Sequence, residues 1–471
     1  MCAAGRYREA AAASAAILAV AFILTARVSI ESLLITWFVT TPLAYFYIRF
    51  PVDKSVITYD RAVFALIILM LLWDRYGPGR RLAGRASSLM ATKFEVAWAL
   101  LSVLALTSAI MKSDDVAYAI KIAVDSFFLP LAAFHLARHH FDARGRANIL
   151  MLGAMLLALF LFITGAFEFA TGTNLLPYKG SELIRERELR VNGPFAADAS
   201  YTIICLLIAV FLKAAPGLLR VRMDRVARLL YLLALCAAIA ATLLPMFRAT
   251  VIALVICWMI LKWAKGRESK AGTDLERVQK STSNLLPYVL IGVAIAVLIF
   301  GPVSIGRRIT DPRNAFGRLA TWEAAAGVAL ERPFFGVGLT NYRDYFHAKY
   351  NWEDESVETV LRARAADSPH SNILWIAADL GFVALALYLI ANLYLVFMGV
   401  RAMKKADGPR RRATACYLAL IAAYWIPGLT LASGYYSDLN LYFFFMIGLL
   451  LNKSLTAPPA SIKGLDRESE F

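Results

Sequence analysis

Long apolar stretches recur along the whole chain, and they limit its possible folds more than any other feature of the sequence. Clear examples are residues 10–26, 32–47, 94–111, 285–302 and 373–398. Each is close to or above the roughly 17 to 25 apolar residues that a helix needs to cross a bilayer. With 59% hydrophobic and 18% charged residues, the composition excludes an ordinary soluble domain. The chain is therefore predicted to be an integral membrane protein.

The predicted fold class is an all-α polytopic membrane protein with about 12 or 13 transmembrane helices and one long helical periplasmic loop. Three apolar runs come first, and ten helices are expected to follow at 94–111, 116–137, 147–170, 196–213, 229–246, 248–264, 285–303, 371–398, 413–432 and 438–452. By region, we expect transmembrane helices over 1–303 and 371–452, the periplasmic loop at 304–370 and a cytoplasmic tail at 453–471. The first three apolar runs do not determine on which side of the membrane the N-terminus lies.

The distribution of charge indicates how these helices are oriented. Much of the net charge of +16 comes from short basic loops such as 75–85, 220–228, 262–270 and 401–412. Short loops rich in Lys and Arg stay in the cytoplasm. Segment 304–370 instead has nine basic and nine acidic residues, as expected of a translocated loop. Orientation thus explains the positive charge, and we expect no nucleic-acid partner.

Arg190 and Arg248 are the first candidate site residues, because each lies at the outer end of an apolar run. Arg190 precedes the turn at 191–195, and Arg248 separates two apolar runs at a short turn where Pro245 favours a helix break. An arginine fork binds a phosphate through two hydrogen bonds. The alternative is that both side chains anchor helix ends by reaching lipid headgroups.

His370 is the third candidate, and it lies between the long external loop and the next apolar run. Its imidazole accepts a proton near neutral pH and suits a general base. Ser368 or Asp367 is expected to cap the following helix, with Pro369 in its first turn. The alternative is a surface or capping histidine. The other four histidines, three of them expected on the cytoplasmic side, are weaker candidates.

The sequence gives no sign of a metal or nucleotide site on the external side. No group of His, Glu or Cys has ligand spacing there, and Gly336 and Gly338 lack the Gly-Lys-Ser/Thr of a phosphate-binding loop. Four of the five cysteines lie inside apolar runs, which does not suit a disulfide framework. We therefore expect no metal, no cofactor and no thiol chemistry.

These elements together resemble the O-antigen ligase and polymerase superfamily, bacterial membrane glycosyltransferases of the GT-C type, most clearly over 190–384. In the ligase motif, His370, Ser371 and Gly381 fit, and Ala384 departs at the last position. The remaining matches are Arg190 with Gly193, Pro194 and Phe195, Arg248 at a helix break, and the series Arg318, Trp322, Pro333, Gly336 and Gly338.

The resemblance implies inverting, metal-independent transfer of a glycan from undecaprenyl pyrophosphate to an acceptor sugar hydroxyl at the periplasmic face of the inner membrane. Arg190 and Arg248 would hold the pyrophosphate, and His370 would act as general base. Arg318 would order the loop or touch the glycan. The acceptor would be lipid A core in a ligase.

Two other functions explain much of the same sequence. A repeat-unit polymerase for O-antigen or exopolysaccharide would use a second lipid-linked glycan as acceptor, and the motifs above do not separate it from a ligase. A transporter of polysaccharide intermediates would also have many helices and charged residues at depth. Loop 304–370, with its arginines and histidine, favours a transferase, because a transporter needs no such segment.

Overall fold

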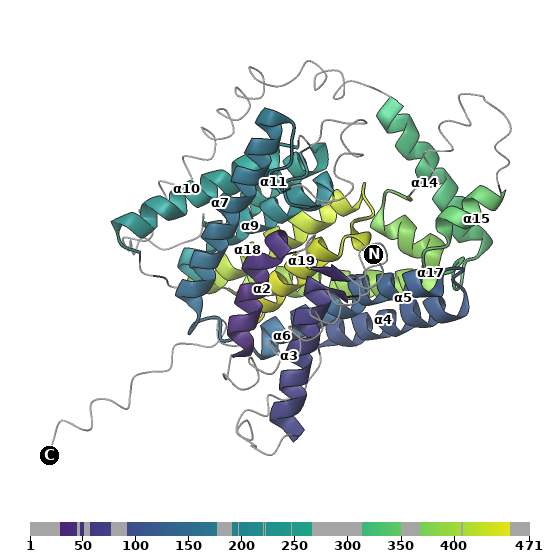
Figure 1. The fold of residues 1–471 in the computed structure, drawn as a ribbon, viewed down its shortest axis with the longest axis horizontal. Helices are drawn as coiled ribbons and strands as arrows, with labels where there is room; N and C mark the ends of the chain where they lie inside the picture. The colour runs from purple at the N-terminus through teal and green to yellow at the C-terminus, as the bar shows by residue number, and fades with distance from the viewer. Residues whose placement is uncertain are drawn as a thin grey trace, which may run out of the picture.

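The computed structural model describes residues 29–44, 48–50, 57–76, 92–176, 191–195, 197–219, 221, 223–245, 247–265, 313–349, 368–406 and 408–452. Nearly all of them are helical (Figure 1). Two short strands, β1 (Arg49–Phe50) and β2 (Ile57–Thr58), form a single antiparallel pair.

In chain order, the helical elements are α2 (Ile30–Ala44), α3 (Tyr59–Tyr76), α4 (Lys93–Met111), α5 (Val116–Ala123), the π-helical turn η1 (Val124–Phe128), α6 (Leu129–His139), α7 (Ala147–Thr171), α9 (Asp198–Leu219), α10 (Arg225–Leu243), α11 (Arg248–Lys265), α14 (Arg313–Glu331), α15 (Tyr342–Lys349), α17 (Asn372–Lys405), α18 (Gly408–Gly428), the 3-10 turn η2 (Ser433–Tyr435) and α19 (Ser437–Leu450).

Six helical segments in the described ranges are long and apolar enough to cross a membrane. They are Lys93–Met111, Val116–His139, Ala147–Thr171, Asp198–Pro216, Arg225–Leu243 and Asn372–Lys404. Because the described residues are also nearly all helical, these segments confirm the predicted fold class of an all-α polytopic membrane protein. The helices expected at 10–26 and 285–303 lie outside the described residues, so the total of 12 or 13 stays a prediction.

Two helices form the centre of the bundle. The apolar span of α9 is 94% buried, and every residue of α19 from Asp438 to Leu450 is buried. α9 packs against α7, α10, α18 and α19, while α19 also packs against α6. Aromatic rings join these layers, with Tyr424 of α18 stacked on Phe443 at 4.1 Å between ring centroids. α9 and α19 therefore act as the core on which the other helices are arranged.

The described part of loop 304–370 consists mainly of α14 and α15. The sequence predicted that this loop is helical, and α14 and α15 confirm helices within its described part. Figure 1 shows α14 and α15 beside α17, on the far side of the molecule from α7 and α10. Apolar residues of α14 and α15 pack against Leu374 and Ala378 of α17, which attaches this part of the loop to the bundle at the first turns of α17.

Candidate functional site

His370 lies immediately before α17, which begins at Asn372 with Ser371 as its N-cap residue. The expected capping by Ser368 is therefore wrong; Asp367, the other expected cap, lies outside the described residues. Ser368 instead accepts a hydrogen bond on Oγ from the backbone N–H of His370, at 3.4 Å. We call the bundle end that contains the start of α17, segment 333–341 and segment 428–438 the His370 end.

The backbone of His370 is held in an unusual conformation. Its φ of 46° lies in the left-handed region, which residues other than glycine seldom adopt. The indole Nε1 of Trp322 on α14 donates to the His370 carbonyl at 3.4 Å. Strained backbone of this kind persists only where the surroundings enforce it, and it is concentrated at functional sites. The half-buried His370 side chain is thus attached to a fixed backbone.

Arg318 approaches the same end from one helical turn before Trp322. Residues four apart lie on one face of a helix, so both side chains point from α14 toward the bundle. The Nη1 of Arg318 donates to the carbonyl of Thr430, in the turn after α18. One face of α14 therefore contacts both the segment before α17 and the segment after α18.

A second connection joins α17 to the turn η2. Asn372 donates through Nδ2 to Ser433 Oγ at 2.6 Å, and its Oδ1 accepts from the Gly434 N–H at 2.9 Å. All three residues are buried. A side chain at position 434 would overlap the ring of Trp375, so a glycine is needed there. The residues that follow His370 are therefore fixed from two directions.

The helix expected at 371–398 is not continuous, because α17 is broken at Gly381. The break frees backbone groups that a continuous helix would pair internally. Segment 333–338 pairs with them: Val337 N–H donates to Ala378 O at 3.0 Å, and Phe382 N–H donates to Pro333 O at 2.6 Å. Loop 304–370 is thereby hydrogen-bonded to the backbone of a helix long and apolar enough to cross a membrane.

Glycines are required on both sides of this contact. Gly336, Gly338 and Gly381 have φ values of 60°, 113° and 81°, which favour glycine. A Cβ on Gly336 would overlap the backbone of Asp379, and one on Gly381 would overlap the carbonyl of Phe334. The contact with α17 explains the motif glycines 336 and 381, whereas a Cβ on Gly338 would instead crowd Asn341 and the Lys112 carbonyl.

Asp379 is a fully buried carboxylate in the same region, and sequence analysis missed it. Its oxygens accept from the backbone N–H groups of Thr340 and Tyr342 at 2.9 and 3.1 Å, and from Trp375 Nε1 at 2.9 Å. Tyr435 OH is a fourth partner, at 3.1 Å. Burial and the nearby carboxylate raise the pKa of the Tyr435 phenol, so it stays protonated as a donor. The only sequence signal was an acid inside an apolar run.

Arg248 is exposed at the first residue of α11. The predicted meeting of two helices near Pro245 is confirmed, because α10 ends at Leu243. Two hydrogen bonds made by residues of α9 connect the turn between α10 and α11 to α19. Thr250 Oγ1 lies 3.2 Å from Thr202 Oγ1, and Ser200 Oγ donates to Asp438 Oδ1 at 3.2 Å.

Asp438 is in the first turn of α19, at the end of segment 428–438, so the α10–α11 turn and the start of α17 lie at the same end of the bundle. Arg248 and His370 therefore share the His370 end.

Arg190 lies outside the described residues, but the turn that follows it is described. The backbone N–H groups of Asn192 and Gly193 both donate to Glu168 Oε2 on α7, at 2.9 and 2.7 Å. Gly193 has φ 55° and packs against the ring of Tyr201 at the start of α9. The chain after Arg190 thus enters the bundle close to the residues that contact the α10–α11 turn.

Part of the chain matches a known protein family. Residues 199–389 match the model of the O-antigen ligase family. The matched region runs from the start of α9 into α17 and includes Arg248, Arg318 and His370, whereas Arg190 precedes it. No curated protein matches the chain. The family match supports the resemblance to the O-antigen ligase and polymerase superfamily, with the ligase motif around His370 inside the matched region.

Proposed function

Starting from the match of residues 199–389 to the O-antigen ligase family, we propose that this multi-pass membrane protein transfers a lipid-linked glycan by an inverting, metal-independent reaction. The donor is a glycan on undecaprenyl pyrophosphate, and the acceptor is a sugar hydroxyl of lipid A core. The observation that carries the proposal is the gathering of His370, Arg248 and Arg318 at one end of the bundle, within the matched region.

His370 is the proposed general base. As the acceptor hydroxyl attacks the anomeric carbon, its proton passes to the imidazole, and the bond to the pyrophosphate oxygen breaks. Attack from the face opposite the leaving group inverts the configuration at that carbon. The constrained backbone of His370 and its contact with Trp322 support this role, because a base must be held in a fixed position relative to the reacting hydroxyl.

Arg248 and Arg190 are the proposed ligands of the pyrophosphate. Negative charge grows on the leaving diphosphate in the transition state, and guanidinium groups that hydrogen-bond it lower the barrier. Arg248 is exposed at a helix start, where a lipid-linked diphosphate has access to it. Arg318 already donates to the Thr430 carbonyl, which supports a positioning role for it at this end of the bundle.

The proposed reaction also sets the location of the protein. An isoprenoid donor stays in the bilayer, and its diphosphate supplies the energy of transfer, so no cofactor is required. A protein with several membrane spans and a charge-balanced external loop suits the periplasmic face of a bacterial inner membrane.

The direct test uses purified protein in proteoliposomes with a lipid-linked donor and a lipid A core acceptor. We expect His370→Ala to reduce product formation by at least about 100-fold, as for loss of a general base. Arg248→Lys should also lose much of the activity, because a point charge replaces a planar fork. His347→Ala, at another histidine of the same external loop, is the matched control and should retain activity. Full activity of His370→Ala at normal protein abundance would remove His370 from the mechanism.

Surface polysaccharide from a deletion strain distinguishes the ligase from its alternatives. Lipid A core that lacks attached polymer indicates a ligase, whereas products limited to a single repeat unit indicate a polymerase. A transporter would form no covalent product in the purified reaction. Single-repeat products, or the absence of a covalent product in the purified reaction, would contradict the proposed ligase function.

A further inference from the structure

A cluster of charged and imidazole side chains lies at the opposite end of the bundle from His370. Glu95 is in the first turn of α4, whereas Ser108, near the last turn, accepts on Oγ from the Leu339 N–H at 3.1 Å. At about 1.5 Å per residue, the 19 residues of α4 span roughly 28 Å. The Glu95 end of the bundle is therefore separated from the His370 end by nearly the length of this helix.

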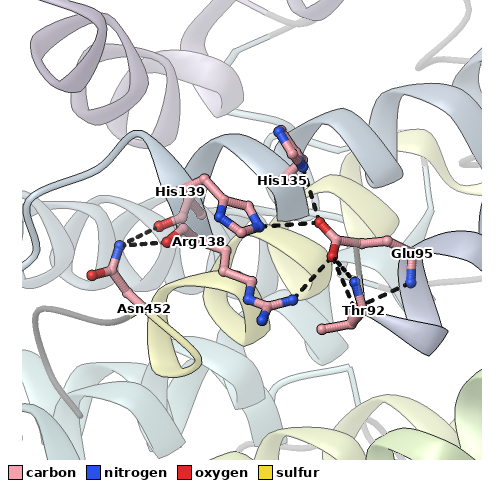
Figure 2. Close-up of polar contacts among 7 residues, drawn as sticks. Thr92, Glu95, His135, Arg138, His139 and Asn452 are labelled. Carbon is pink, nitrogen blue, oxygen red and sulfur yellow. Dashed lines mark hydrogen bonds and ion pairs between the residues drawn. The ribbon is translucent and has the colours of Figure 1, made fainter. Parts of the chain in front are cut away.

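Two imidazoles share one oxygen of the Glu95 carboxylate (Figure 2). His135 Nδ1 lies 2.9 Å from Oε1, and His139 Nε2 lies 3.4 Å from the same oxygen. Both histidines are on α6, four residues apart, so they project from one face of that helix. Their ring centroids are 4.6 Å apart.

The other carboxylate oxygen is held by separate donors. Oε2 accepts from the backbone N–H and the hydroxyl of Thr92, at 2.7 and 2.9 Å, and from Arg138 Nη1 at 3.0 Å. Glu95 is buried, with only 5% of its side chain exposed. The carboxylate is consequently fixed through Oε2, while Oε1 remains directed at the two imidazoles.

His139 has an unsatisfied nitrogen that faces this oxygen. Its side chain is 5% exposed, and among the described residues its Nε2 makes no hydrogen bond despite lying 3.4 Å from Glu95 Oε1. Buried polar atoms are nearly always paired, so an unpaired one suggests a missing partner. A ligand placed between the carboxylate and the two rings would satisfy it.

We propose that Glu95, His135 and His139 bind one divalent transition-metal ion of the zinc class. Their ligand atoms all lie within 4.8 Å of one another. Ligands about 2.0 to 2.2 Å from a tetrahedral Zn²⁺ are separated by roughly 3.4 Å. The distances from Glu95 Oε1 to the two imidazole nitrogens are close to this value, so small side-chain rotations complete the site.

The donor set determines the class of ion. Two imidazoles with one carboxylate suit zinc and neighbouring transition metals, whereas calcium and magnesium prefer oxygen ligands. The His135 side chain is 33% exposed, so an ion and a completing water molecule can reach the site from solvent. Arg138 and Thr92 hydrogen-bond the non-ligating oxygen, as outer residues of metal sites commonly do.

The bound ion would fasten α4 to the end of α6. The same end of α6 is already held by Asn452, whose Nδ2 donates to the carbonyls of Ala137 and Phe141 at 2.9 and 2.6 Å. The site is remote from His370 and takes no part in the proposed glycosyl transfer. Its test is therefore independent of that function.

The experiment uses the full-length protein in detergent, stripped with a chelator and titrated with Co²⁺, whose visible absorption reports imidazole and carboxylate ligation. We expect one equivalent to bind and to be displaced by Zn²⁺. His135→Gln and His139→Gln should each weaken binding by at least about tenfold, and the double variant should lose the absorption band.

His140→Gln is the matched control. Its ring lies 5.8 Å from that of His135, but it is not one of the three residues whose ligand atoms lie together. Binding by this variant should stay within about twofold of wild type. All variants must elute as the same monodisperse species without metal. Absence of a Co²⁺ band in the wild-type protein, or its persistence in the double variant, would overturn the proposal and leave an ion-pair network between α4 and α6.

Discussion

The two ends of the bundle are stabilised in different ways. At the His370 end, a broken helix and a returning loop pair through backbone groups, and three glycines with positive φ permit their close approach. At the Glu95 end, regular helices are joined by side chains, with Glu95 contacting Thr92, His135 and Arg138. The His370 end therefore depends on close backbone pairing as well as on buried side chains such as Asp379, whereas the Glu95 end depends on side-chain chemistry.

This difference suits the two proposed roles. A reaction that aligns a lipid-linked donor with an acceptor needs fixed positions, which a backbone locked by several hydrogen bonds provides. When one partner in a side-chain network between regular helices changes, the backbone hydrogen bonds of those helices remain in place. We therefore expect substitutions at the His370 end to have large effects and those at the Glu95 end to have graded ones.

Of the substitutions considered for stability, Gly381→Ala is expected to lower the free energy of unfolding the most. The new Cβ would overlap the Phe334 carbonyl, and alanine is disfavoured at the φ of 81°. Strain and overlap together should destabilise the protein by about 3 to 5 kcal/mol. Equilibrium unfolding in mixed micelles measures this loss.

Gly327→Ala is the matched control for that substitution. Gly327 lies inside α14, and a Cβ there would meet no atom within 4 Å among the described residues. Alanine favours a helix over glycine, so this variant should gain up to about 1 kcal/mol. If Gly381→Ala were as stable as Gly327→Ala, the His370 end would not depend on backbone shape.

Asp379→Leu tests the buried carboxylate at the same end. Leucine leaves the N–H groups of Thr340 and Tyr342 without their acceptor, and the expected loss is about 2 to 3 kcal/mol. The same unfolding measurement applies, with Asp114→Leu as an exposed control. A loss below about 1 kcal/mol, on the order of a surface substitution, would show that this carboxylate does not hold the loop.

Local sequence patterns predicted most of the fold. The apolar runs predicted the helices around 94–111, 147–170 and 248–264 to within one residue at either end. Pro245 correctly marked the boundary between α10 and α11. These features could be predicted because helix length and helix breaks depend on neighbouring residues.

The parts that were missed depend on residues far apart in the chain. The break at Gly381 is fixed by segment 333–338, so a single glycine in an apolar run was interpreted as continuous helix. Asp379 is recognised as a structural residue only through its hydrogen bonds from Thr340 and Tyr342. The pair His135 and His139 is recognised as a candidate site only because Glu95 of another helix lies beside it. No local pattern contains these contacts.

The smallest expected effect is that of Thr92→Ala at the Glu95 end. Thr92 and Glu95 form a capping box at the start of α4, with the Thr92 Oγ1 accepting from the Glu95 N–H at 3.3 Å. Arg138 and the Thr92 N–H still hold the carboxylate in the variant, so the loss should be only about 1 kcal/mol. Thr107→Ala is the control in the same helix, where an exposed hydroxyl donates to the Val103 carbonyl one turn earlier, and it should change stability by less than about 0.5 kcal/mol. A Thr92→Ala loss as large as that of Gly381→Ala would contradict the graded behaviour expected of this end, because it would mean that one side-chain hydrogen bond fixes the whole network.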